Sequence, residues 1–198
     1  MPPPRGCLCQ CPGQERHGVS PADVTITLPP TDDGAGAVCR KITEEVLLEK
    51  IAKATSARLA DDFRVFLREA EKIGIEPEGR DSSISLFWHE PNTGRRFSFG
   101  SVYAEDARVE TKFVRMSYGK IGLDEGIGMN YIMRVAAIVP GATVHENMKD
   151  GKAWPRVCVG SREVSLADLL PKSAAWLAAM QIVMQETEAA AAAKPTGV

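Results

Sequence analysis

Apolar side chains recur at spacings of three and four residues in two stretches after residue 40, and this period predicts two helices. In the first stretch, Thr43 precedes Glu44 and Glu45, so a capping hydroxyl and two acidic residues mark the beginning of a helix. The second helix is capped by Ser56 and ends at Gly74, a residue suited to the left-handed conformation that closes many helices. Its apolar face consists of Leu59, Phe63, Phe66, Leu67, Ala70 and Ile73.

Alternation of apolar and polar residues then predicts three strands. The first contains Ile84, Leu86 and Trp88, the second spans Arg95–Tyr103 and the third spans Arg108–Val114. Because short turns join them, the natural arrangement is an antiparallel meander. One face is apolar and aromatic, ready to pack against helices. The other face turns toward water or a partner and carries Arg96, Ser98, Gly100, Arg108, Glu110 and Lys112.

The second half of the chain begins with a helix capped by Asp124 and stopped by Pro140. The elements predicted after it are strands at Ala142–Glu146, Arg156–Val159 and Glu163–Val164 and a last helix from about Ser173. The order α-α-β-β-β-α-β-β-β-α predicts an α+β fold, with an antiparallel three-stranded meander packed against helices. The aromatic residues expected in its core are Phe63, Phe66, Trp88, Phe97, Phe99, Phe113, Tyr131 and Trp176.

The two ends of the chain differ from its middle. Residues 1–40 are rich in Pro and Gly and have no sustained apolar period, so we interpret them as a disordered leader. We expect residues 41–188 to form a single α+β domain and residues 189–198 to form a disordered tail. A chain of 198 residues is long enough for one domain with a proper core, without a metal or disulfide to hold it together.

Charge and composition exclude several classes of protein. The chain has 24 Lys and Arg against 26 Asp and Glu, a formal charge of −2, which argues against a nucleic-acid binder that is basic over its whole surface. No apolar run approaches the roughly 20 residues of a membrane span, so no membrane association is expected. The five cysteines lie in two unlike settings and do not form a disulfide framework, which favours a cytoplasmic location.

The cysteines near the beginning of the chain are the first candidates for chemistry. Cys7, Cys9 and Cys11 form a Cys-x-Cys-x-Cys cluster. Structural zinc usually takes four ligands with two to four residues between paired cysteines, and this spacing is tighter. We therefore interpret the cluster as adventitious and expect neither a metal nor another resident cofactor.

Glu110 and Lys112 suggest a catalytic alternative. They lie two residues apart on a predicted strand, so both side chains project from the same face. Metal-dependent phosphodiesterases of the PD-(D/E)XK class need such a carboxylate to bind Mg²⁺ and such a lysine beside the attacking water. The Pro-Asp of that class is missing. Asp106 lies only four residues before Glu110 in a turn, Asp81 precedes the first strand, and Glu90 is at best a substitute. The same spacing is also common in exposed ion pairs of little energetic value.

A basic stripe is the second functional feature. The six basic residues between positions 95 and 120 are Arg95, Arg96, Arg108, Lys112, Arg115 and Lys120, against the acidic Glu105, Asp106 and Glu110. Basic side chains on one face of a sheet could meet the phosphates of a nucleic acid. The other interpretation is a solvated sheet face of mixed charge.

A family resemblance covers roughly Thr43–Val144. The segments that carry it are Thr43–Glu45, Ala60–Ile75, Phe97–Tyr103 and Arg108–Phe113. They resemble a bacterial module that follows an N-terminal PD-(D/E)XK nuclease-like domain in uncharacterised proteins. The resemblance implies an accessory or recognition domain whose catalytic partner domain is not in this sequence. It assigns no functional residue.

The leading hypothesis is therefore a non-catalytic accessory domain. It would bind nucleic acid or a protein partner through the outer face of the meander. The first alternative is a PD-(D/E)XK-like nuclease that uses Glu110 and Lys112, with Glu90 as a third candidate and Mg²⁺ as its only cofactor. The second alternative is a purely structural protein-interaction domain.

Overall fold

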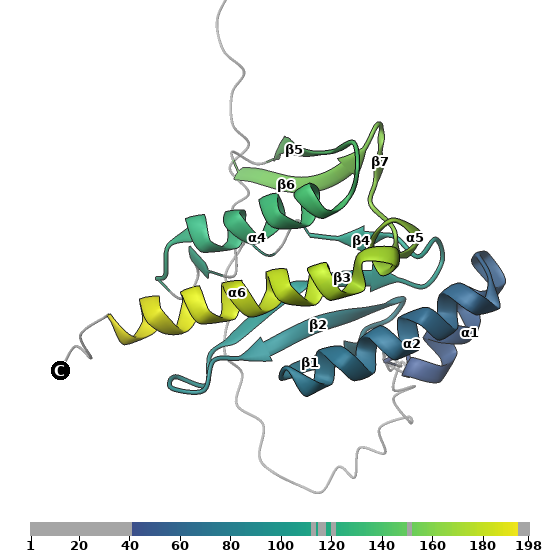
Figure 1. Ribbon diagram of the computed structural model, residues 1–198, viewed down its shortest axis with the longest axis horizontal. Helices are drawn as coiled ribbons and strands as arrows, with labels where there is room; N and C mark the ends of the chain where they lie inside the picture. The colour runs from purple at the N-terminus through teal and green to yellow at the C-terminus, as the bar shows by residue number, and fades with distance from the viewer. Residues whose placement is uncertain (1–40, 112–113, 115–117, 120–121, 150–151, 194–198) are drawn as a thin grey trace, which may run out of the picture. The chain divides into compact units, whose positions relative to one another are not determined.

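A computed structural model describes residues 41–111, 114, 118–119, 122–149 and 152–193 (Figure 1). The described residues belong to one unit that runs from Cys39 onward. The predicted leader therefore lies outside the described residues. The fold is α+β with antiparallel sheets, as the order of apolar patterns predicted.

The first two helices are α1 (Glu44–Ala54) and α2 (Ala57–Lys72). The side chains of Thr43 and Ser56 each accept a hydrogen bond from a backbone N–H in the first turn of their helix. Gly74 follows α2 with a φ of 87°, where a residue with a Cβ would be strained. Both caps and the glycine stop are confirmed.

The first sheet holds four antiparallel strands in the order β1-β2-β3-β4. They are β1 (Ile75–Gly79), β2 (Ser83–His89), β3 (Arg96–Tyr103) and β4 (Val109–Glu110). Strand β1 was not predicted, because it contains Glu76, Pro77 and Glu78 and does not alternate clearly. Proline is tolerated in β1 because β1 is an edge strand. The third predicted strand is shorter than expected and ends at Glu110 instead of Val114.

A second antiparallel sheet has the order β5-β6-β7 and is formed by β5 (Ala142–Lys149), β6 (Lys152–Val159) and β7 (Arg162–Glu163). Val164 connects the two sheets. It donates its N–H to the carbonyl of Val157 at 3.0 Å and accepts the N–H of Val109 at 2.8 Å. The segment that holds β7 therefore continues between β6 and β4, and the strands follow one another as β1-β2-β3-β4-β7-β6-β5.

The remaining helices are α4 (Glu125–Ile138), α5 (Leu166–Leu169), a 3₁₀ turn η1 (Leu170–Lys172) and α6 (Ser173–Ala192). Asp124 caps α4 as predicted, with its carboxylate accepting the N–H of Gly126 at 2.8 Å. Helix α6 continues past the predicted end at Glu188, because alanine is the best helix former. Among the described helices, none combines the length and the apolar character needed to cross a membrane.

Helices α2, α6 and α4 lie on one side of the strands, as Figure 1 shows. Their buried side chains share a single hydrophobic core with the inward side chains of the first sheet. Seven of the eight predicted core aromatics are buried, and Phe113 lies outside the described residues. The ring of Phe66 stacks on Trp176 with centroids 4.3 Å apart, which brings α2 and α6 together.

Two buried hydrogen bonds fix α4 and α6 relative to the sheet. The hydroxyl of Tyr131 donates to the carbonyl of Phe99 at 3.2 Å and accepts the indole N–H of Trp176 at 2.9 Å. Burial raises the pKa of Tyr131, so its hydroxyl stays protonated and can donate. We call this arrangement the tyrosine relay. It satisfies polar groups that would be costly to bury unpaired.

Phe66 and its neighbour Val65 test the assignment of the core. Phe66 is 2% exposed and Val65 is 62% exposed on the same helix. We expect Phe66→Ala to lower the free energy of unfolding by about 3–5 kcal/mol, because it leaves a cavity beneath Trp176. Val65→Ala should change it by less than about 0.5 kcal/mol. Equal losses in chemical denaturation would contradict this packing.

Candidate functional site

The surface that the sequence singled out is the side of the first sheet that faces away from the core, which we call the outer face. Successive strand residues point to opposite sides, so the strand pairing identifies its members. They are Glu76, Glu78, Ser83, Ser85, Phe87, His89, Arg96, Ser98, Ser101, Tyr103 and Glu110, with Arg108 directly before β4. This face is polar and charged, with two aromatic rings.

The first group on the outer face surrounds Phe87, and we call Lys41, Glu78, Arg80, Phe87 and Arg96 the Phe87 cluster. The guanidinium of Arg96 lies 3.4 Å from the centroid of the Phe87 ring, and that of Arg80 lies 5.4 Å from it. Glu78 binds Arg96 and lies 3.4 Å from Arg80 and 3.3 Å from Lys41. The hydrogen bond from Arg96 is the main cause that lowers the pKa of Glu78.

The second group is the Tyr103 cluster, formed by Tyr103, Arg108, Glu110, Arg156 and Glu163. The guanidinium of Arg108 lies 4.1 Å from the centroid of Tyr103, whose hydroxyl donates to Glu110 at 3.1 Å. Glu163 accepts a hydrogen bond from Arg156 at 2.8 Å and lies 3.7 Å from a nitrogen of Arg108. Burial raises the pKa of Tyr103, and the adjacent Glu110 carboxylate adds to the effect.

Several buried polar atoms in the Tyr103 cluster lack a hydrogen bond from the residues that the structure describes. They are Nε of Arg108, Nε of Arg156 and Oε2 of Glu163, and the Glu163 side chain is only 10% exposed. Buried polar groups almost always find a hydrogen-bond partner, which can be a water molecule or a ligand. Because these atoms have almost no accessible surface, only a small buried group such as a water molecule could complete the network.

Glu90 has a structural role at the turn between β2 and β3. Its carboxylate accepts hydrogen bonds from the backbone N–H groups of Asn92 at 3.0 Å and Thr93 at 2.6 Å, and from both side chains. Burial by itself raises the pKa of Glu90, but these hydrogen bonds outweigh burial and leave the pKa below its usual value. Glu90 therefore holds this turn together.

The structure does not bring Glu90 and Glu110 together. The backbone of Glu90 pairs with Arg95, whereas Glu110 pairs with Ser101, and six residues of extended chain span about 15–20 Å. Carboxylates that share a Mg²⁺ each lie about 2 Å from it. Glu110 is also 3% exposed, whereas the sequence placed it on a face turned toward water or a partner. Lys112, the other nuclease candidate, lies outside the described residues.

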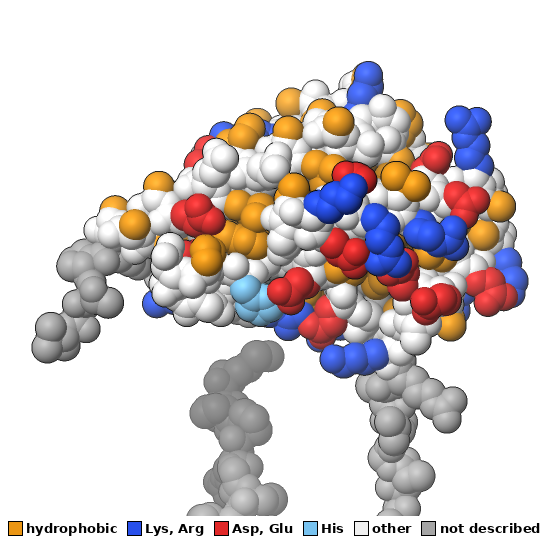
Figure 2. Space-filling view, turned by 60° about the horizontal axis from the view of Figure 1, so that its bottom comes forward, with side chains coloured by type: hydrophobic (Ala, Val, Ile, Leu, Met, Phe, Trp, Pro, Cys, Tyr) orange, Lys and Arg blue, Asp and Glu red, His pale blue; other side chains and the backbone are white. Residues whose placement is uncertain are grey.

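Of the six basic candidates, the structure describes three. Arg96 and Arg108 both lie on the outer face, and Arg95 is exposed in the turn that leads into β3. The other candidates, Lys112, Arg115 and Lys120, lie outside the described residues. Each described Lys or Arg of the two clusters has a carboxylate oxygen within 3.7 Å. Acidic and basic side chains intermingle in the same way on the face of the molecule shown in Figure 2.

Of the residues in the two clusters, sequence reasoning placed only Arg96, Arg108 and Glu110 on the outer face. Simple alternation from Phe97 predicts Tyr103 on the apolar face, and the irregular pairing between Ser85 and Phe87 moves it to the outer face. Glu78 and Arg80 were not considered because β1 was not predicted, and Arg156 and Glu163 lie about fifty residues after Tyr103. A signal for the latter pair was present in the hairpin Arg156–Glu163, whose strands pair Cys158 with Glu163. What the sequence lacked was the contact of this hairpin with β4.

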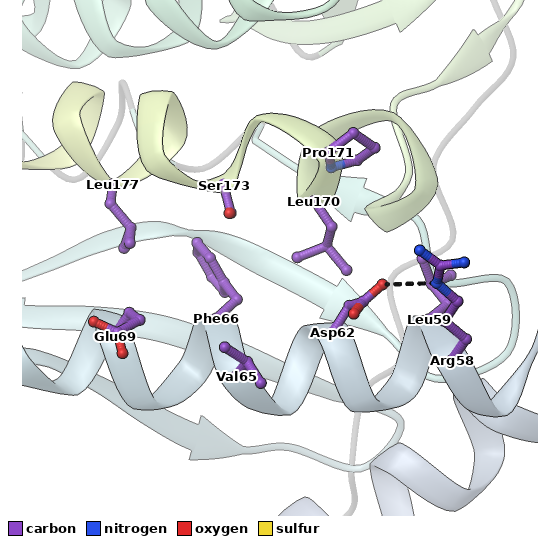
Figure 3. A pocket seen from close by; sticks show the side chains of 10 residues that line it. All are labelled: Arg58, Leu59, Asp62, Val65, Phe66, Glu69, Leu170, Pro171, Ser173 and Leu177. Carbon is purple, nitrogen blue, oxygen red and sulfur yellow. Dashed lines mark ion pairs between the residues drawn. The ribbon is translucent and has the colours of Figure 1, made fainter.

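A groove lies between α2 and the beginning of α6 (Figure 3). It has a volume of about 350 Å³, and its apolar lining includes Leu59, Phe66 and Leu177. Its charged residues lie on α2, where Arg58 forms an ion pair with Asp62 at 3.9 Å. The groove is apolar with a charged rim, and its lining does not include the residues of the outer face.

The described residues contain no group of three or more His, Cys, Asp or Glu side chains placed to hold a metal ion. Comparison with known protein families, curated proteins and solved structures finds no match for this chain.

Substitution of Glu90 tests its structural role. Glu90→Ala should lower the free energy of unfolding by about 2–3 kcal/mol, because the N–H groups of Asn92 and Thr93 lose a charged acceptor. Glu105→Ala, at an exposed acidic position in another turn, should change it by less than about 0.5 kcal/mol. Because the pKa of Glu90 is lowered by folding, its contribution is present above the unfolded pKa near 4 and is lost as the pH falls.

Denaturation of both variants at pH 7 and at pH 3 measures this contribution. A Glu90→Ala variant as stable as the parent at pH 7 would contradict the assignment.

Proposed function

We propose that this chain is a non-catalytic recognition module that binds a protein partner through the outer face of the first sheet. The observation that carries the proposal is the pairing of arginines with aromatic rings and carboxylates across neighbouring strands, at Phe87 and at Tyr103. The described helices pack on the opposite side of the sheet, so the hydrophobic core does not include the outer face.

The charges favour a protein over a nucleic acid. A phosphate backbone is bound by Lys and Arg side chains that release its counterions. Here Glu78 already neutralises Arg96, and Glu163 lies beside Arg108 and Arg156. A phosphate would have to displace these carboxylates or bind in their repulsive field. A partner of mixed charge can instead exchange ion pairs with the cluster.

The composition of the two clusters supports the same choice. Tyrosine, phenylalanine and arginine are enriched at the centres of protein interfaces, where a few of them supply most of the binding energy. Stacking on Phe87 and Tyr103 holds Arg96 and Arg108 in place before binding, which reduces the entropy lost on association.

The test compares the full chain with a variant of the outer face and with a control variant that loses an arginine elsewhere on the surface. One combines Phe87→Ala with Arg96→Ala. The control is Arg64→Ala, which removes an exposed arginine that pairs with Asp61 at 2.6 Å on α2, on the helical side. Proteins captured from an extract of the source cells by the immobilised parent chain are purified and titrated individually. We expect the double variant to weaken a specific complex at least about thirtyfold and the control to leave it within about twofold.

Two further measurements separate this proposal from its alternatives. Oligonucleotides should bind more weakly than about 100 μM at moderate salt. If oligonucleotides instead bind tightly and in a salt-dependent way, and Arg96→Ala and Arg108→Ala each weaken that binding, the partner is a nucleic acid and not a protein. Cleavage of DNA or RNA with Mg²⁺ or Mn²⁺ that disappears in Glu110→Ala would instead establish a nuclease. A captured partner that binds the double variant as tightly as it binds the parent chain would contradict the proposed face.

A further inference from the structure

Strand β5 lies at the outer edge of the second sheet and offers that edge for pairing. Strand β5 pairs with β6 in an unbroken antiparallel register, from Ala142 opposite Val159 to Lys149 opposite Lys152. Within the described part of the chain, no strand pairs with its other edge. An edge of this length with neither proline nor a bulge is a template for a further strand, and natural proteins usually protect such edges.

The helical layer ends before the sheet does. Helix α4 packs across both β5 and β6, and α6 packs against one side of α4. On the β5 side of α4 the structure has a groove of about 550 Å³, which shows that no further helix fills this position among the described residues. Its residues are Met129, Met133, Ala136, Ala137, Ala142, Thr143, Val144 and Glu146. Met133 is 53% exposed, one of the few large apolar side chains on the described surface.

We propose that a second copy of this chain occupies this edge and groove. In the dimer, β5 would pair antiparallel with β5 of the other copy around a twofold axis, and the two α4 helices would pack against each other above the joined sheet. Such an interface is isologous, because the same residues of both copies meet across the axis. The proposal is independent of the function assigned to the outer face.

The spacing of the elements fits this arrangement. Neighbouring strands lie about 4.8 Å apart. Because α4 packs against both β5 and β6, we place its axis over the boundary between them. Its twofold mate would therefore lie two strand spacings away, at about 9.6 Å. Packed helices have axes 8–10 Å apart, so two α4 helices at this distance would be in contact without further movement. The described residues of one copy leave this helix position empty, and a second copy would fill it.

The side chains of α4 suit such a contact. Ala136 and Ala137 allow the helices to approach closely, and Met129 and Met133 are flexible enough to fill an irregular gap. Each copy would contribute an eight-residue strand and one face of a 14-residue helix. This is about half of the 20–30 residues that each side of a standard interface supplies. We therefore expect a reversible dimer with a dissociation constant in the micromolar range.

Sedimentation of the full chain over a concentration series from about 1 to 500 μM tests the proposal. The parent chain should show a monomer–dimer equilibrium. Met133→Glu should raise the dissociation constant at least about tenfold, because it places two like charges at the axis and removes apolar contact. The control Val65→Glu makes the same kind of change at an exposed residue of α2 and should leave the equilibrium unchanged. Circular dichroism confirms that both variants are folded.

Each other outcome overturns the proposal. A parent chain that stays monomeric to 500 μM would show that the edge of β5 does not pair with a second copy. A dimer that Met133→Glu leaves intact, or that Val65→Glu dissociates, would place the interface elsewhere.

Discussion

The fold depends on a sheet that is apolar on one side only. In β2 and β3, Ile84, Trp88 and Phe97 point toward the helices, and polar or charged residues occupy the opposite side. The hydrophobic gain therefore comes from a single layer of helices. The tyrosine relay then sets where that layer lies, because Tyr131 must satisfy its buried hydroxyl through both Phe99 and Trp176. A buried hydroxyl without these partners would cost about 1–3 kcal/mol.

Both surfaces that we assign to partners follow from this one-sided construction. The outer face stays free of the core, and its charges are balanced by contacts within the face, at Glu78 and at Glu163. In the described part of the chain, the helical layer, once fixed by Tyr131, ends with α4, which packs on β5 and β6 and leaves a groove on its β5 side. The two surfaces have different chemistry: the outer face combines guanidinium groups with aromatic rings, and the groove is lined mainly by apolar side chains. They would therefore select different partners.

The sequence predicted what depends on local pattern. Caps at Thr43, Ser56 and Asp124, the glycine after α2 and the aromatic core all follow from period and residue type, and the structure confirms them. It could not predict β1, because an edge strand needs pairing on one side only and tolerates a polar sequence. The Tyr103 cluster could not be predicted for another reason. It depends on a contact between β4 and Val164, more than fifty residues later, which no local pattern encodes.

Hydroxyl-radical footprinting of the free full chain tests the central claim most directly, because it reports which aromatic rings solvent reaches. If the helices cover only one side of the first sheet, Phe87 and Tyr103 should be oxidised much faster than Phe97 and Phe99, which lie on β3 and face the core. Oxidation of Phe87 and Tyr103 as slow as that of Phe97 would contradict the account. It would show that another part of the chain already covers the face that we assign to a partner.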